Sequence, residues 1–335
     1  MKLNYQQIKD VTLGAAYIEQ LNGKTAFHRF TKAQEELYKS VELGFYNKSF
    51  ANSCITLEFE TNSTSLFLKT HVIPRSSRKF FSHDIFVDNK LCGLLKGKFE
   101  DDENIIDGKI VEERFLLGED KTIKNVRIHL PWSCSSDIIE LSLDDGASLN
   151  PIKKSQKMIF YGDSITQGYD AEYTSNSYAS RVSMELNVEA RNKGIGGEIF
   201  RPELAILKDE DFAPDIITVA YGTNDWFAGI PIETFENRVK IFLKKLTINH
   251  PNAKIFVITP IWRADYQNHS TFGSFNEIKN CLSKIAQRYA TVTVIDGFDF
   301  VPHDCKLFSD LYLHPNDAGF KYYSESLIAE MKKYI

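Results

Sequence analysis

The spacing of apolar residues changes near residue 150 of this 335-residue chain. Before that point, apolar and polar residues alternate, and Ile55, Leu57 and Phe59 fall on one face of a predicted strand. Alternation is typical of strands with one face buried and the other in water. From Lys157 onward the apolar residues form unbroken runs, which is typical of parallel strands buried on both faces. The change predicts two domains with different architectures.

The first half is expected to be a β-sandwich over residues 1–150. Further short apolar runs follow the first strand, and turn signals such as Asp88-Asn89 separate them; these runs lie at 65–69, 83–87, 124–130 and 138–143. Several short strands at this spacing favour two packed antiparallel sheets. The segment 150–155 is the predicted linker.

The second half, residues 156–335, alternates strands with helices. Four continuous strands are expected, with a weaker one at 188–191; the four lie at 157–162, 215–221, 254–260 and 291–296. Helical patterns occupy 232–246, 274–289 and the stretch from 315 to the C-terminus. Strands alternating with helices indicate βαβ units, and hence an α/β domain with helices on both faces of a parallel sheet.

Ligands of such a sheet usually bind just beyond the carboxyl ends of its strands. Four loops there carry groups suited to chemistry: Gly162-Asp163-Ser164, Asn192 to Glu198, Gly222 to Asp225, and His314-Pro315-Asn316. A serine between strand and helix can present its hydroxyl, a glycine N–H can approach an oxyanion, and a carboxamide can donate to one. The alternatives are a helix-capping serine and an Asx-turn.

The four loops together resemble the SGNH or GDSL hydrolases over about residues 157–335, in the family's order. The resemblance implies a three-layer α/β/α, flavodoxin-like domain. It makes Ser164 the nucleophile and His314 the general base. The oxyanion would be held by the N–H groups of Ser164 and Gly197 and by the side chain of Asn224. A β-sandwich of jelly-roll type before such a domain is similar to some bacterial carbohydrate esterases.

The acidic member of the triad departs from the family pattern. The family places an aspartate three residues before the histidine, where this chain has Leu311. We expect Asp310, four residues before, to orient His314 across a bulge. A Ser–His dyad, or an acid at Asp296 or Asp304, remains the alternative.

The expected activity is hydrolysis of short-chain esters, acetyl esters above all, on a carbohydrate. A thioesterase, a lysophospholipase or an acyltransferase could use the same groups, and a non-catalytic carbohydrate-binding protein is the alternative outside enzymes. Trp226 and Trp262 follow the third and fourth strands and are candidates for stacking on a sugar, or else for the core.

Composition excludes several classes of partner. The formal net charge is −5 and no basic stripe occurs, which argues against nucleic-acid binding. No apolar run is long enough to span a membrane, and the N-terminus lacks an apolar signal region. Five scattered cysteines suit reduced thiols, so we expect a cytoplasmic protein. Neither a cofactor nor a metal is expected, because the His/Cys/Asp spacing near Asp304 fits no zinc pattern. A homo-oligomer remains possible.

Overall fold

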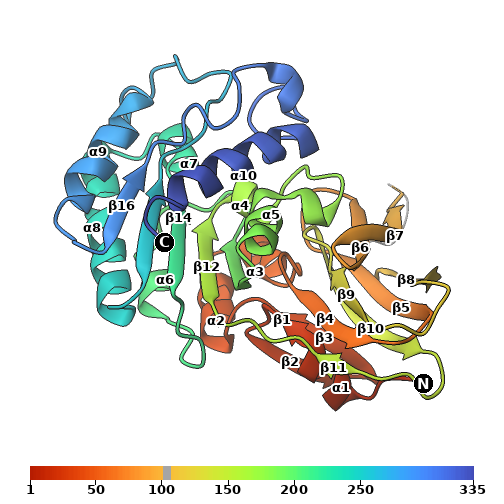
Figure 1. Cartoon of the computed structure of the whole chain (residues 1–335). Helices are drawn as coiled ribbons and strands as arrows, with labels where there is room; N and C mark the ends of the chain where they lie inside the picture. Colours follow the sequence, from red (N-terminus) through yellow and green to blue (C-terminus); the bar gives the residue numbers. More distant parts are fainter. Residues whose placement is uncertain (101–106) are drawn as a thin grey trace.

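The computed structural model describes residues 1–100 and 107–335. Figure 1 shows two regions, with the N-terminal strands on one side and the C-terminal sheet with its helices on the other. The chain passes from the first region to the second just before β12 (Lys157–Gly162).

The N-terminal region contains two antiparallel sheets. The first has the order β1 (Thr12–Leu13), β4 (Thr56–Thr61), β9 (Lys124–His129), β6 (Phe80–Val87) and β7 (Lys90–Lys98), with β11 (Asn150–Pro151) beside β4. The second has the order β2 (Tyr17–Leu21), β3 (Lys24–His28), β10 (Cys134–Leu143), β5 (Ser65–Pro74) and β8 (Lys109–Leu116). The helix α1 (Tyr5–Val11) precedes them.

The two sheets enclose a hydrophobic core. Leu57 and Phe59 of β4 belong to the same buried cluster as Leu66 and Leu68 of β5. Each pair has a polar or half-buried residue between its members, as alternation along a strand requires. The predicted antiparallel sandwich is therefore confirmed, while its jelly-roll connectivity stays a prediction. β11 shows that the expected linker begins as a strand paired with β4.

The C-terminal region is built on a five-stranded parallel sheet. Its order is β13 (Glu189–Gly194), β12, β14 (Ile216–Ala220), β15 (Lys254–Ile258) and β16 (Val292–Ile295). Numbered within the sheet, this order is 2-1-3-4-5, the flavodoxin-like arrangement. The weak strand expected at 188–191 is present as β13 at the edge of the sheet.

Helices cover both faces of this sheet, which completes the predicted α/β/α layering. Ile159 and Tyr161 of β12 share a core with α6 (Pro202–Ile206), α8 (Ile232–Asn249) and α9 (Asn276–Ala286). Met158 and Phe160 face the other way, towards α5 (Tyr178–Glu185) and α10 (Asp317–Met331). Short helices α4 (Ser164–Gln167) and α7 (Thr223–Phe227) directly follow β12 and β14, and η1 (Thr174–Asn176) and η2 (Cys305–Leu307) are single 3₁₀ turns.

Two helices of the N-terminal half pack on the C-terminal domain as well as on the sandwich, where Glu35 contacts Tyr17 and His28. They are α2 (Lys32–Val41) and α3 (Leu43–Ser49), between β3 and β4. Phe30 and Tyr38 belong to the core on the α8 face of the parallel sheet. The buried guanidinium of Arg29 donates to the carbonyl oxygens of Asn192 and Gly194. The division at 1–150 and 156–335 therefore stays a prediction, with α2 and α3 bridging it.

Within the described part of the chain, no helix combines the length and the apolar character that a bilayer crossing requires.

Candidate active site

Ser164 stands at the junction of β12 and α4. The strand ends at Gly162, where an added Cβ would lie 1.9 Å from Oγ1 of Thr166 and 2.9 Å from the carbonyl oxygen of Ala220. Only glycine fits so tight a turn. Asp163 caps the helix, its carboxylate accepting from the N–H of Ile165 at 3.0 Å. The capping role therefore belongs to Asp163, which leaves the Ser164 hydroxyl available for another partner.

That partner is His314, 150 positions further along the chain. The Ser164 Oγ lies 2.8 Å from Nε2 of His314. His314 comes three residues before α10, whose N-cap is Asn316. The structure thus brings together the serine and the histidine that the sequence singled out, at hydrogen-bond distance.

Asp310 holds the other side of the imidazole. Its Oδ2 lies 2.7 Å from Nδ1 of His314, and its Oδ1 accepts from the backbone N–H groups of Tyr312, Leu313 and His314. The extra residue, Leu311, has φ +58° and is 62% exposed. It bulges out of the loop, as the expectation for Asp310 required.

The carboxyl of Asp310 is held in its charged form. Burial raises its pKa, but the hydrogen bond from His314 and those from backbone N–H groups outweigh burial, and the net pKa lies well below its usual range. The two alternative acids have other partners. Asp296 accepts from Thr259 and Lys279, and Asp304 accepts from the N–H of Lys306.

A second carboxylate, Asp170, lies beside the histidine. Its Oδ2 is 3.9 Å from Nδ1 of His314, and Arg78 of the N-terminal half holds it with two N–H groups. Among the described residues, Asp170, Asp310 and His314 are the group whose ligand atoms lie close enough to share a metal ion, within 4.8 Å of one another. Each of them has a protein partner in the structure.

The loop after β13 forms a tight turn from Ile195 to Glu198. The N–H of Glu198 donates to the carbonyl oxygen of Ile195 at 3.0 Å. Gly197 has φ +89° and Gly196 does not share the positive sign, which identifies a type II turn. In the described residues, nothing accepts a hydrogen bond from the N–H of Gly197. This N–H is free for a ligand oxygen.

Asn224 lies in the first turn of α7 and is half-buried. Its Nδ2 donates to the carbonyl oxygen of Glu198 at 2.9 Å, which ties α7 to the end of the Gly197 turn. A carboxamide carries two N–H donors. One is used in this contact and the second remains for a ligand.

The structure also reveals contacts that sequence reasoning missed. Phe45 lies 3.5 Å from where a Cβ of Gly197 would be, and Nζ of Lys48 donates to the carbonyl oxygen of Gly196 at 2.7 Å. Both belong to α3, in the N-terminal half. Arg78 reaches Asp170 from the same half. No motif marks these residues, since their role depends on how the two halves pack.

The two candidate stacking residues are buried. Trp226 is 2% exposed, and its indole N–H donates to the carbonyl oxygen of Gly273. Trp262 is 8% exposed and stacks on His303 with ring centroids 5.4 Å apart. Side chains packed in this way agree with the core alternative and not with an open platform for a sugar. The expectation that they stack on substrate finds no support here.

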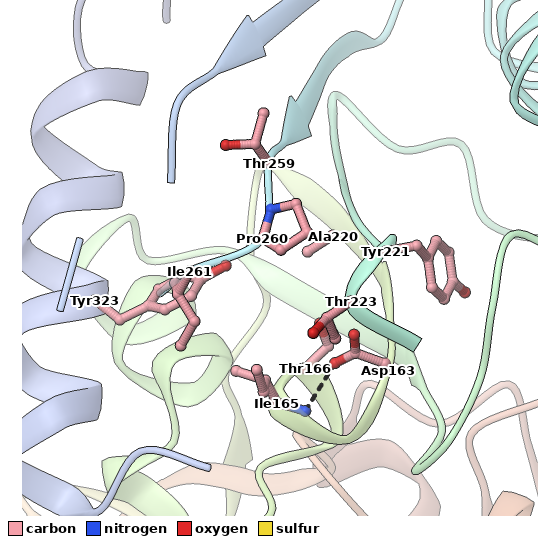
Figure 2. A pocket seen from close by; sticks show the side chains of 10 residues that line it. All are labelled: Asp163, Ile165, Thr166, Ala220, Tyr221, Thr223, Thr259, Pro260, Ile261 and Tyr323. Atoms are coloured by element: carbon pink, nitrogen blue, oxygen red, sulfur yellow. Dashed lines mark hydrogen bonds between the residues drawn. The ribbon is translucent and has the colours of Figure 1, made fainter. Parts of the chain in front are cut away.

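A small cavity of about 20 Å³ lies behind the nucleophile, between α4, the end of β14 and α10. Figure 2 shows Asp163 at its edge, with Thr166 and Tyr323 among the lining residues. The volume suits one water molecule and is far too small for an ester. Burial raises the pKa of Asp163 to about 6. This cavity therefore lies among the residues that pack around the β12–α4 turn, and it is not a substrate-binding site.

Comparisons with known proteins find a family model that matches the C-terminal region. The family model described as GDSL-like lipase/acylhydrolase matches residues 160–322. No curated protein matches the sequence.

Solved structures match nearly the whole chain. A salicylyl-acyltransferase from a tetracycline biosynthetic pathway superimposes with a TM-score of 0.83 at 20% identity, covering 96% of this chain and 94% of its own. A GDSL-like lipase from Bacteroides ovatus, called putative in its description, gives 0.72 at 19%, with coverages of 99% and 97%. A family two carbohydrate esterase from Clostridium thermocellum, solved with cellohexaose, gives 0.66 at 15%, with coverages of 84% and 93%. At these identities the likeness concerns the fold. Residues 160–322 of this chain, which hold Ser164 and His314 at hydrogen-bond distance, form a GDSL-like lipase/acylhydrolase domain.

Proposed function

We propose that this chain is a serine esterase that hydrolyses acetyl and other short-chain esters of carbohydrates through an acyl-enzyme. The observation that carries the proposal is the hydrogen-bonded series from Ser164 Oγ to His314 Nε2 and from His314 Nδ1 to Asp310. A serine hydroxyl is a weak nucleophile at neutral pH and needs a base within about 3 Å. His314 meets that requirement.

In the first half of the reaction, Ser164 Oγ attacks the ester carbonyl carbon while Nε2 of His314 takes the hydroxyl proton. The carbonyl oxygen becomes an oxyanion. The N–H groups of Ser164 and Gly197 and the second N–H of Asn224 are its donors in this mechanism. His314 then gives the proton to the leaving alcohol oxygen as the C–O bond breaks. The alcohol departs and the acyl group stays on Ser164.

In the second half, water replaces the alcohol. Nε2 of His314 takes a proton from the water as its oxygen attacks the acyl carbon, and returns that proton to Ser164 Oγ as the acid leaves. Asp310 keeps the Nδ1–H tautomer in place and stabilises the imidazolium formed in both halves. Its strongly lowered pKa suits that role, because the carboxylate stays charged throughout the pH range of the reaction.

Two observations support a short acyl group on a polar alcohol. The Phe45 ring stands against the Gly197 turn, which narrows the space beside the oxyanion donors. The fold is shared with a family two carbohydrate esterase that was solved with cellohexaose. Neither buried tryptophan contributes an aromatic face, so sugar recognition would rest on other residues.

A fluorophosphonate probe tests the activated serine directly. The wild-type chain should be labelled, Ser164→Ala should not, and the matched variant Ser183→Ala, on α5, should label like the wild type. Hydrolysis of p-nitrophenyl acetate should fall by roughly 10⁶ in kcat for Ser164→Ala. An unlabelled wild-type chain that nevertheless binds oligosaccharides would support the non-catalytic alternative and contradict the proposal.

Chain-length profiling tests the acyl part. We expect kcat/KM to fall from p-nitrophenyl acetate to butyrate to octanoate, and acetylated xylose or glucose to release acetate. A preference for octanoate, or for acyl thioesters, would instead favour a lysophospholipase or a thioesterase on the same residues.

Acyl transfer is the second candidate, favoured by one observation. The salicylyl-acyltransferase structure covers 96% of this chain with a TM-score of 0.83. A transferase uses the same acyl-enzyme but admits an acceptor alcohol in place of water. Adding sugars or glycerol to the p-nitrophenyl acetate assay separates the two: a transferase forms the new ester faster than free acetate, and an esterase does not.

A further inference from the structure

Lys48 of the N-terminal half contacts the turn that carries the proposed oxyanion donor. Its Nζ lies 2.7 Å from the carbonyl oxygen of Gly196. That oxygen and the N–H of Gly197 belong to one peptide unit. A cation therefore binds one end of an amide whose other end is free to donate.

The orientation of this amide is the variable part of the turn. Types I and II differ mainly by a flip of the central peptide, and type II requires a positive φ at its third residue. Both central residues here are glycines, Gly196 and Gly197, which tolerate either arrangement at little steric cost. The turn sequence by itself therefore leaves the direction of the Gly197 N–H poorly determined.

The surrounding contacts fix the ends of the turn. The N–H of Gly196 donates to Oε1 of Gln167 at 2.9 Å, and the carbonyl oxygen of Glu198 accepts from Asn224. Among the described residues, Lys48 provides the hydrogen bond to the central carbonyl. Losing it would leave the two ends anchored and the peptide between them free to flip.

The ammonium group lies in surroundings that strengthen its influence. Lys48 is half-buried, and its Nζ is 5.3 Å from the centre of the Phe45 ring. Two carboxylates act on its charge, those of Glu42 and of the buried Glu198, and Glu198 is itself paired with Arg201. In direct contact at 2.7 Å, a positive charge on the carbonyl oxygen draws electron density from the amide and makes its N–H a stronger donor.

We propose that Lys48 is a positioning residue for the oxyanion site, holding and polarising the Gly196–Gly197 peptide so that the Gly197 N–H faces the developing oxyanion. This rests on the esterase function proposed above. The N-terminal half would thereby take part in catalysis without touching the substrate. It would also couple activity to the docking of α3 on the C-terminal domain.

Three variants of Lys48 separate the hydrogen bond from the charge, with p-nitrophenyl acetate as substrate. Lys48→Met removes both, and we expect kcat to fall about 10- to 100-fold with KM nearly unchanged, somewhat less than for outright loss of a donor. Lys48→Gln keeps a neutral donor and should lie between. Lys48→Arg keeps a charged donor and should stay within about threefold of wild type. Lys39→Met, an exposed lysine of α2, is the matched control and should not change kcat.

Two further readouts distinguish positioning from a structural role. Binding of a boronic acid, which mimics the tetrahedral intermediate, should weaken in Lys48→Met by the same factor as kcat/KM. The order of the Lys48 variants by melting temperature should differ from their order by kcat. A purely structural contribution of Lys48 does not depend on whether the Gly197 N–H faces the oxyanion. If Lys48→Met does not fold, the test rests on the other two variants. A higher kcat for Lys48→Arg than for Lys48→Gln then supports the proposal.

The proposal is overturned if Lys48→Gln matches Lys48→Arg in kcat and in boronate affinity, or if Lys48→Met folds and retains wild-type kcat. It is also overturned if KM alone rises. A wild-type chain without fluorophosphonate labelling or ester hydrolysis would instead refute the esterase function itself, so the two failures are distinguishable.

Discussion

The carboxylate of Asp310 lies 2.7 Å from Nδ1 of His314, although four positions rather than three separate the two residues. Leu311 takes up the extra residue with φ +58°. The second oxygen of Asp310 accepts three backbone N–H groups of its own loop. The backbone of the loop therefore holds the carboxylate in place independently of its contact with the imidazole. The irregular spacing still yields the geometry of a triad.

Asp310→Asn is expected to lower kcat by about 10²- to 10⁴-fold. The reason is that a carboxamide N–H facing Nδ1 of His314 favours the tautomer whose Nε2 carries the proton. That tautomer cannot accept the proton of Ser164. The carboxamide oxygen can still accept the backbone N–H groups, so the melting temperature should change little. Steady-state kinetics with p-nitrophenyl acetate measure the effect.

Asp170→Asn is the matched control, since Asp170 is the other carboxylate near Nδ1, at 3.9 Å. We expect Asp170→Asn to lower kcat by less than about tenfold. A reversal of the two effects, or a loss below tenfold for Asp310→Asn, would indicate a dyad or a triad completed by Asp170.

Leu311 offers a test of the bulge. A non-glycine residue in the left-handed region costs roughly 1–2 kcal/mol, partly offset by the greater unfolded-state freedom of glycine. Leu311→Gly should therefore have a free energy of unfolding about 0.5–1 kcal/mol higher than Leu311→Ala. Urea denaturation compares the two, and both should keep wild-type kcat because the side chain is exposed. Equal stabilities would mean that the bulge relaxes.

Much of this site could be predicted from sequence because of a property of parallel sheets. The carboxyl ends of parallel strands meet at one edge, so motifs directly after β12, β13 and β14 had to lie close together. Ser164, Gly197 and Asn224 each follow one of these strands. Their nearness follows from topology, whereas the role of His314 is implied by the resemblance of His314-Pro315-Asn316 to a family motif.

The remaining residues could not be predicted, because their positions depend on docking between the two halves. Lys48 and Arg78 reach the site from elements that are remote in sequence, and neither lies in a recognisable pattern. The sequence left two alternatives for Trp226 and Trp262, a substrate surface or the core, and both side chains are buried. Apolar side chains at strand ends can pack inwards as readily as outwards, and local sequence does not decide between them.

Asn224 yields the third prediction. One N–H of its carboxamide already binds the carbonyl oxygen of Glu198, so the side chain is held in place without substrate. Asn224→Ala should lower kcat by about 10²–10³-fold with a smaller change in KM, since the missing donor acts mainly in the transition state. Asn224→Asp should be at least as inactive, because a carboxylate would repel the oxyanion. Wild-type kcat in Asn224→Ala would remove this residue from the site.

The fourth prediction concerns Asp225, whose carboxyl is buried next to Asn224. Burial raises its pKa from 3.8 to about 7. The folded protein therefore keeps a proton on this group where the unfolded chain has lost it. The contribution of this proton to the free energy of unfolding is complete below about pH 4 and is lost as pH rises through about 7. The free energy of unfolding falls with a slope of at most about 1.4 kcal/mol per pH unit.

Asp225→Asn removes this titration while keeping an acceptor for the N–H of Phe200, which lies 3.3 Å from Oδ2. Relative to wild type, the variant should gain free energy of unfolding from pH 5 to pH 7 and level off above it. The raised pKa of Asp163, about 6, is common to both proteins and cancels in the difference. Urea denaturation at pH 5, 6, 7 and 8 measures the two curves, with Asp10→Asn, an exposed aspartate, as control. Parallel curves for Asp225→Asn and wild type would show that the carboxyl is charged in the folded protein at neutral pH, because only a group whose protonation changes on folding contributes a slope.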